Sequence, residues 1–351
     1  MTGSMKPMAT PATPTKPADP AASSARRSDR RLSGGWMIVA DKELGDHIGS
    51  LRFFIVLVIV GVAGVIAMYS AADTLKSLNS TSGQLAGQPS VFIRVFSVAP
   101  TIAGLTLPSF VGFMALLGPL FGIAFGFDAV NGERAERTLP RLLAQPIHRD
   151  DVINGKFVAG IVAIGIAIVS VTAIVSAVIV FKLGIVPSAE DVLRLLLWIV
   201  ITIVYVSFWL AFAMLCSVLL RRAANSALVA IALWLGLALF GIYLVTLVAN
   251  AIVSGDTTAS LADQYSNAQI QQLLTSLQPA GLYQQATQAI LDPTFRAFFA
   301  LPSQLEGAIQ GTLSFTQSVL IVWQQIVALV AVTIVVFAGA YIAFLRQEVR
   351  A

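Results

Sequence analysis

Residues 133–156, ERAERTLPRLLAQPIHRDDVINGK, separate two long apolar runs at about 104–127 and 157–181. The stretch holds four Arg, one Lys and four carboxylates, although only 11% of the whole chain is charged. Apolar runs of this length suit the hydrocarbon core of a membrane, which a helix of about 20 residues can cross. The arrangement predicts two membrane-spanning helices joined by a charged loop outside the bilayer.

The composition of the whole chain indicates the same class. Its 351 residues are 57% hydrophobic and 11% charged, with a mean hydropathy of +0.82, whereas soluble domains are about 25% charged. We therefore expect an all-α membrane protein with six transmembrane helices. The six runs have no Asp, Glu, Lys or Arg in their interiors and lie at about 53–72, 104–127, 157–181, 195–220, 226–249 and 319–345.

Lysine and arginine are unevenly distributed over the segments between these runs. With the N-terminus inside, the outside segments hold five of the 22 Lys and Arg residues, which leaves 17 for the inside. The five are Lys76, Arg94, Lys182, Arg194 and Arg296. Because positive residues concentrate in cytoplasmic loops, both termini are predicted to be cytoplasmic, in a multi-pass protein of the cell membrane.

Two segments precede the first span. Residues 1–35 are rich in Pro, Ala, Ser and Thr and are predicted to be a disordered cytoplasmic leader, and the six-span membrane domain occupies residues 53–351. In residues 36–52, apolar side chains recur at helical spacing, which predicts an amphipathic elbow helix in the membrane interface. A simple lead-in to the first span is the alternative. The apolar positions are Trp36, Val39, Ala40, Leu44, Ile48 and Leu51.

The segment before the last span, residues 250–318, is long and is predicted to be external. It is rich in glutamine, contains prolines, and places Leu273, Leu274 and Leu277 where they could share one face of a helix. We expect short helices that dip into the outer leaflet or cap the bundle. A floppy loop is the alternative.

The sequence lacks the patterns that several other classes require. An ion-coupled carrier usually places a carboxylate or histidine in its spans, and these spans contain neither. A P-loop ends in Gly-Lys-Ser/Thr, but Phe157 follows Gly155 and Lys156, and Asp150 stands where the first glycine should be. The single cysteine, Cys216, rules out an internal disulfide and is expected to be buried. We therefore expect no catalytic residue, metal or cofactor on this chain.

Three glycines, Gly118, Gly122 and Gly126, recur every four residues in the second apolar run. Small residues at this spacing let two helices approach closely. They predict either packing within one bundle or a seam with a second copy of the chain.

The charged stretch itself has the features of a short helix. Thr138 can cap it, Pro140 is tolerated in its first turn, and Pro146 limits its length. Its apolar edge consists of Leu139, Leu142 and Leu143. From the residues alone, such a surface suits either docking to a soluble partner or a solvated turn that carries positive-inside charge.

The same stretch resembles the cytoplasmic coupling region of type-2 ABC-transporter permeases. The family pattern runs roughly Glu-Arg-Glu-x-Gly-Thr-Leu-Glu-x-Leu-Leu-x-x-Pro-Ile-x-Arg, followed by Gly-Lys. This sequence departs from it at Arg137 and Pro140, where the family has Gly and Glu. The matching residues are Glu133, Arg134, Glu136, Thr138, Leu139, Leu142, Leu143, Pro146, Ile147, Arg149, Gly155 and Lys156.

Three further stretches support the resemblance. VADKELGDHIGSLRFF at 39–54 looks like the family's N-terminal elbow, and LLRRAANSAL at 219–228 looks like its loop between spans four and five. LQPAGLYQQATQAILDP at 277–293 is similar to the external segment of a subgroup that includes copper-enzyme maturation permeases. Together these stretches cover most of the chain after residue 36.

The resemblance implies that the loop forms a coupling helix, which docks on a separate cytosolic ATPase. Two ATPase copies would hold ATP and Mg, and a second permease copy, identical or different, would complete the assembly in the lipid bilayer. The expected function is export; the alternatives are a relay of motion to an external partner and an ion-driven carrier. No nucleic-acid partner is expected. The implied ATPase contacts are Glu133, Arg134, Glu136, Arg137, Thr138 and Leu139, with Arg141 and Arg149 as secondary candidates.

Overall fold

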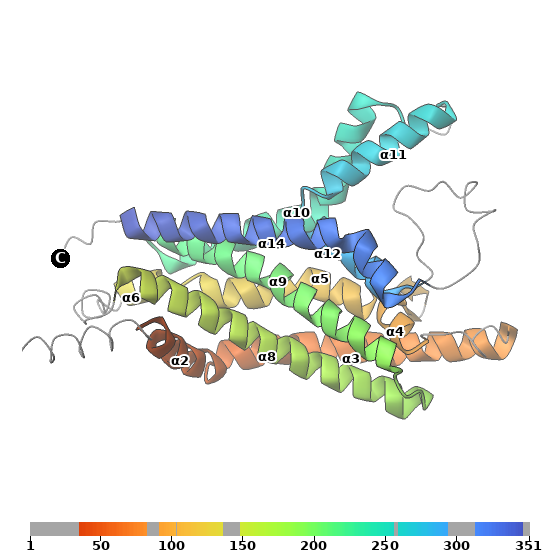
Figure 1. The fold of residues 1–351 in the computed structure, drawn as a ribbon, viewed down its shortest axis with the longest axis horizontal. Coiled ribbons are helices and arrows are strands. Elements are labelled where there is room, and N and C mark those ends of the chain that lie inside the picture. Colours follow the sequence, from red (N-terminus) through yellow and green to blue (C-terminus); the bar gives the residue numbers. More distant parts are fainter. Residues whose placement is uncertain are drawn as a thin grey trace, which may run out of the picture.

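The computed structural model describes residues 35–82, 91–102, 104–135, 148–255, 259–293 and 313–346. In these parts of the chain, six helical segments are long and apolar enough to cross a membrane, which confirms the predicted all-α class. Figure 1 shows them as a bundle of long helices. They are α3 (Leu51–Ser82), α5 (Phe110–Gly126) continuing into α6 (Asn131–Ala135), α8 (Arg149–Leu183), α9 (Ala189–Leu219), α10 (Ala223–Ile252) and α14 (Phe315–Arg346). The predicted leader lies almost wholly outside the described residues.

The second span begins later than predicted. The apolar run starts at residue 104, but helix α5 starts at Phe110, so Pro108 lies before the helix. The preceding residues form two short antiparallel strands, β1 (Thr101–Ile102) and β2 (Leu105–Thr106), with Gly104 at a φ of 81°. Proline disfavours helical backbone in the residue before it, and Ser109 then caps α5 by accepting a hydrogen bond from the Gly112 N–H at 3.1 Å.

The N-terminal elbow forms helix α2 (Gly35–Ile48), which packs along α8. Of its predicted apolar stripe, Val39 is buried, whereas Trp36 and Leu51 are exposed and Leu51 already belongs to α3. The contact with α8 is close because Gly155 lacks a side chain: a Cβ there would lie 2.7 Å from the Trp36 carbonyl oxygen. The elbow therefore rests on the bundle as well as exposing apolar side chains.

Helix α9 forms the centre of the bundle and packs against α5, α8, α10 and α14. The glycine stripe of α5 faces it: a Cβ on Gly122 would lie 2.5 Å from the Val206 carbonyl oxygen, and one on Gly126 would lie 2.7 Å from that of Leu210. The four-residue glycine spacing therefore serves packing within this chain. Cys216 is buried on α9, as predicted.

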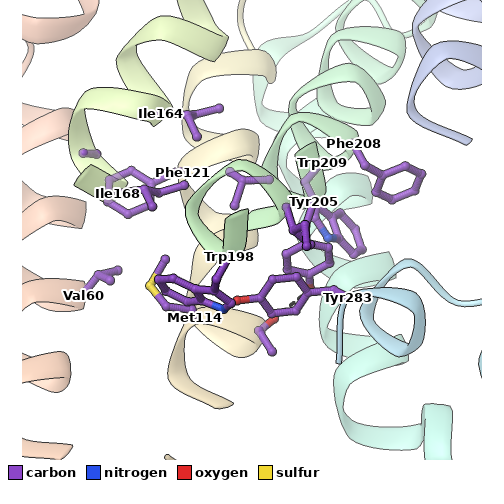
Figure 2. Packing of buried hydrophobic residues seen from close by; sticks show 14 of the residues in the cluster. Val60, Met114, Phe121, Ile164, Ile168, Trp198, Tyr205, Phe208, Trp209 and Tyr283 are labelled. Carbon is purple, nitrogen blue, oxygen red and sulfur yellow. Dashed lines mark hydrogen bonds between the residues drawn. The ribbon is translucent and has the colours of Figure 1, made fainter. Parts of the chain in front are cut away.

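The segment predicted to be external, residues 250–318, contains two helices, α11 (Leu261–Thr275) and α12 (Pro279–Leu291), so the floppy-loop alternative is wrong for these residues. Helix α12 packs into the bundle, where Tyr283 stacks on Tyr205 of α9 with ring centroids 4.5 Å apart (Figure 2). Its hydroxyl also lies 3.1 Å from the Thr202 hydroxyl. Helix α11 and the C-terminal part of α10 stand away from the bundle (Figure 1). Residues 256–258 and 294–312 are outside the described parts.

Two short elements complete the described fold. Helix α4 (Val91–Arg94) and the 3₁₀ turn η1 (Val95–Ser97) pack against the bundle beside α3 and α9. Phe96 of this turn lies 5.7 Å from Phe110 and 6.3 Å from Trp198, measured between ring centroids. These aromatic contacts pack η1 against the N-terminal end of α5 and against α9.

Candidate functional site

The predicted contact set lies only partly within the described residues. Glu133 and Arg134 lie on α6, and Arg149 is the first residue of α8. Asp150 and Asp151 occupy the first turn of α8, where their negative charge is favourable to the helix dipole. Five of the predicted contacts are outside the described residues: Glu136, Arg137, Thr138, Leu139 and Arg141.

A buried lysine joins the two sides of this loop. Lys156, on the second turn of α8, has only 6% of its side chain exposed. Its Nζ lies 2.8 Å from Oε1 of Glu43 on the elbow helix and 2.9 Å from Oε1 of Glu133 on α6. One cation therefore links α2, α6 and α8. A buried charge is tolerated only when it is paired and hydrogen-bonded, so these carboxylates account for its position.

The sequence identified Lys156 as part of the loop motif and as an inside charge, but it did not predict this role. Glu43 was not a candidate at all. The available signals were the Gly-Lys pair that ends the motif and the Lys-Glu pair of the elbow. Neither pattern says that the two stretches, 113 residues apart, meet in the fold.

The start of α6 is anchored to the end of α9. The hydroxyl oxygen of Ser217 accepts hydrogen bonds from the backbone N–H groups of Val130 and Asn131, each at 3.1 Å. Arg134 extends toward the same helix, where its guanidinium lies 3.5 Å from the Val218 carbonyl oxygen. Helix α6 is therefore held by α9 on one side and by Lys156 on the other.

A cavity of about 380 Å³ opens beside the buried lysine, between α2 and the junction of α5 and α6. A second ion pair, between Arg52 at the start of α3 and Asp128, lies close by. Arg52 also sits over the Phe127 ring, 4.9 Å from its centroid. The charged or titratable residues that line the cavity are Lys42, Glu43, Asp46, His47, Asp128, Glu133 and Lys156.

His47 packs into this region with its ring centroid 4.8 Å from that of Phe125. Burial lowers the pKa of His47 below its ordinary value of 6.5, although the neighbouring Glu43 carboxylate acts in the opposite direction. The neutral ring is therefore favoured in the folded chain. In the described parts of the chain, no cluster of His, Cys, Asp and Glu has the composition of a metal site.

These features lie at one end of the bundle, where Figure 1 shows α2, α6 and the C-terminal end of α14. They form a mechanical junction in which the elbow, the start of the charged loop, and spans one, three and four meet. These ion pairs and hydrogen bonds tie the positions of α2, α6, α8 and α9 to one another.

A comparison with protein-family models matches residues 37–349 to a family described as ABC-2 family transporter protein. The match includes the elbow, the charged loop, all six long helices and the external segment. A comparison with curated proteins found no match.

Proposed function

This chain belongs to the ABC-2 transporter family, and from that premise we propose that it is a non-catalytic permease subunit that exports a substrate. A separate cytosolic ATPase, in two copies, docks on the loop at residues 133–149 and hydrolyses ATP with Mg. A second permease copy, identical or different, completes the unit. The observation that carries the proposal is the junction at Lys156, which ties the first residues of that loop to two other helices.

The proposed mechanism follows the contacts outward from the loop. Closure of the two ATPases displaces the coupling helix, and α6 moves with it because the two are continuous in sequence. Lys156 passes that displacement to α8 and, through Glu43, to the elbow. Ser217 passes it to the end of α9. Spans two, three and four and the elbow helix then shift together. A loop surrounded only by solvent would not couple these helices.

In this proposal the end of the bundle that holds α2 and α6 faces the cytoplasm, with both chain termini on that side of the cell membrane. The positive-inside distribution supports this orientation. The exposed His148, beside the start of α8, offers a position to test it. A cysteine introduced there, in a chain whose native Cys216 is replaced by serine, should react with a membrane-impermeant maleimide only in inside-out vesicles.

Co-purification with the ATPase tests the docking surface. Glu133 is a poor position for charge reversal, because its carboxylate pairs with Lys156 and reversal would also disturb the interior. Arg137→Glu is a better choice, with Lys76→Glu as the control because Lys76 is exposed near the opposite end of α3. We expect Arg137→Glu to reduce the amount of ATPase recovered, while the control recovers a normal amount. Equal recovery with both variants would remove residues around 137 from the docking surface.

A second candidate function, an ATP-driven relay of motion to an external partner, is favoured by a buried arginine near the other end of the bundle. Arg194 was predicted to lie in an outside loop, but it lies within α9 and is fully buried. All five of its N–H donors are used. They bond to Glu190 (3.1 and 2.8 Å), the carbonyl oxygens of Ile290 (2.8 Å) and Leu313 (2.6 Å), and the Ser318 hydroxyl (3.0 Å).

This arrangement attaches α12 and the start of α14 to span four, so any movement of that span would carry them along. The backbone N–H of Leu313 also bonds to the Pro293 carbonyl oxygen at 2.8 Å, which brings together the two ends of segment 294–312. ATP turnover in the reconstituted complex separates the two functions. An exporter should respond to added cargo, whereas a relay should respond to an external partner and to no small molecule.

A further inference from the structure

A cavity of about 180 Å³ lies where the external helices meet the bundle. Its walls come from α5, α9, α10 and the corner between α11 and α12. A single buried water needs roughly 10–15 Å³ of such space, so this cavity can hold a group of many atoms. It is therefore a site that a ring or a short chain could fill.

The cavity separates two parts of the protein that are held in different ways. Helix α12 is fastened to α9 by Tyr283 and Thr202. Helix α11 is instead fastened to α10, since Asn267 donates a hydrogen bond to the Asn250 side-chain oxygen at 2.8 Å. The corner between α11 and α12 reaches across the gap, where the Gln278 amide donates to the Gly241 carbonyl oxygen at 3.3 Å. A molecule in the cavity would therefore touch both parts.

The lining excludes charged ligands and favours apolar ones. Among the described residues that line the cavity, none is Asp, Glu, Lys, Arg or His, and three are aromatic: Tyr205, Trp209 and Trp234. Transferring an ion into such surroundings without a partner would be costly. Apolar and aromatic walls with a few convergent polar groups are the usual composition of a small-molecule site.

One polar group in this wall has only an imperfect partner. The Trp209 side chain is 1% exposed, and its indole N–H faces the Tyr205 hydroxyl without a hydrogen bond of normal geometry. The polar groups of the other two aromatic residues both donate hydrogen bonds. The Tyr205 hydroxyl donates to the Ala115 carbonyl oxygen at 2.7 Å, and the Trp234 N–H donates to the Leu116 carbonyl oxygen at 3.1 Å. A buried donor with a poorly aligned partner is unfavourable, and a ligand oxygen would satisfy it better.

The cavity also has a side that reaches the surface of the bundle. Ile242 and Leu116 both line it, and they are 60% and 36% exposed. Both lie within spans that have no charged residue in their interiors, so the exposed face is one that lipid would cover. A ligand can therefore arrive from the bilayer without crossing a charged or strongly solvated surface.

We infer that this cavity binds the ring or end group of an uncharged amphipathic molecule, which enters from the bilayer and gives a hydrogen-bond acceptor to Trp209. The molecule is the cargo of the proposed exporter, so this assignment rests on that function. Because the cavity lies between the α10–α11 pair and the rest of the bundle, the bound molecule would also bias the position of that pair.

Photolabelling of the full chain in nanodiscs, without any ATPase, tests the binding site. The probe is a long-chain alcohol that carries a diazirine, and the competitors are the unlabelled alcohol and the alkyl sulfate and alkyl ammonium of equal length. We expect saturable labelling of cavity residues that only the alcohol displaces. Even labelling of lipid-facing helices, or equal competition by the charged amphipaths, would overturn the inference.

Three variants sharpen the result. Ala238→Trp fills the cavity from its exposed side and should reduce saturable labelling by more than about fivefold. Trp209→Phe keeps the ring but removes the N–H, which should weaken binding by about three- to tenfold. Trp198→Phe removes a buried indole N–H from the same helix, which faces the Tyr283 hydroxyl outside the cavity lining, and this variant should bind normally. Equal binding by all three variants would refute the assignment.

ATP turnover by the complex then tests whether the ligand is cargo. The unlabelled alcohol should raise turnover in the unaltered complex and fail to do so with Ala238→Trp. Saturable labelling combined with unchanged turnover would overturn the assignment as cargo. If no ATPase associates with the chain while labelling remains saturable, the exporter function fails and the binding site stands.

Discussion

Replacement of Lys156 by methionine should detach the elbow helix from the bundle. The substitution preserves most of the apolar stem and removes the charge that lies 2.8 Å from Glu43 and 2.9 Å from Glu133. Breaking a buried ion pair by removing one partner costs about 3–5 kcal/mol. We take the lower end, because the two carboxylates keep 14% and 16% of their side chains exposed and can regain some water.

Hydrogen exchange in detergent or nanodiscs measures this loss directly. A decrease of about 3 kcal/mol in the free energy of local opening corresponds to a fall of roughly two orders of magnitude in the protection of α2 amides, at 1.4 kcal/mol per tenfold. Lys42→Met is the matched control. Lys42 also lies near Glu43, at 3.7 Å, but 65% of its side chain is exposed. Its loss should cost at most about 1 kcal/mol, or less than about fivefold in protection.

A compensated variant separates the charge effect from a packing defect. Adding Glu43→Gln and Glu133→Gln to Lys156→Met removes the stranded carboxylates and should restore most of the lost protection, because a buried ionic cluster can often be replaced by neutral groups. The reasoning is refuted if Lys156→Met leaves α2 protection within about threefold of the unaltered chain. It is also refuted if the triple variant exchanges as fast as the single one.

Three further perturbations give separate expectations. Arg194→Met leaves several buried acceptors without a donor, so the free energy of local opening of α12, measured by hydrogen exchange, should fall by at least about 3 kcal/mol. Unchanged exchange would show that α12 is held by its aromatic contacts alone. Gly122→Ala places a Cβ 2.5 Å from a carbonyl oxygen of α9 and should lower the free energy of unfolding by about 1–3 kcal/mol. At Gly236 nothing lies within 4 Å of the added Cβ, so Gly236→Ala should be neutral or slightly stabilising. Similar melting temperatures of the two variants would contradict close packing at α5. Because burial lowers the pKa of His47 below 6.5, its contribution to stability is present above pH 6.5 and is lost as the pH falls below it. Melting curves from about pH 7.5 to about 5.5 should show this loss, and His47→Gln should flatten it.

The long helices could be predicted because their signal is local. Hydropathy over about 20 residues reports which stretches suit the bilayer, and each helix satisfies its own backbone hydrogen bonds. All six predicted runs therefore fall on long helices, although α3 ends ten residues after the first run and α8 begins eight residues before the third. The second run shows the limit of hydropathy alone: residues 104–109 are apolar enough to extend the span, but Pro108 and Ser109 begin the helix later.

The candidate site was predictable in part. The loop motif indicated where a partner would dock, and it included Glu133, Arg134 and Lys156. It did not show that Glu133 turns inward or that the elbow supplies Glu43. The glycine stripe likewise predicted a close helix contact without naming its partner, which the structure identifies as α9.

The sequence alone determined that this chain is a bundle of six membrane helices with a charged loop of permease type, because hydropathy, charge placement and motif spacing are properties of neighbouring residues. Only the tertiary structure decided what the charges at the helix ends do. Lys156 and Arg194 look like ordinary loop cations in the sequence, yet both are buried by partners from other helices, including one 113 residues away for Lys156 and one 124 residues away for Arg194. Such pairs form because a buried cation must find every partner it needs within reach, and reach is set by how helices pack rather than by their order along the chain.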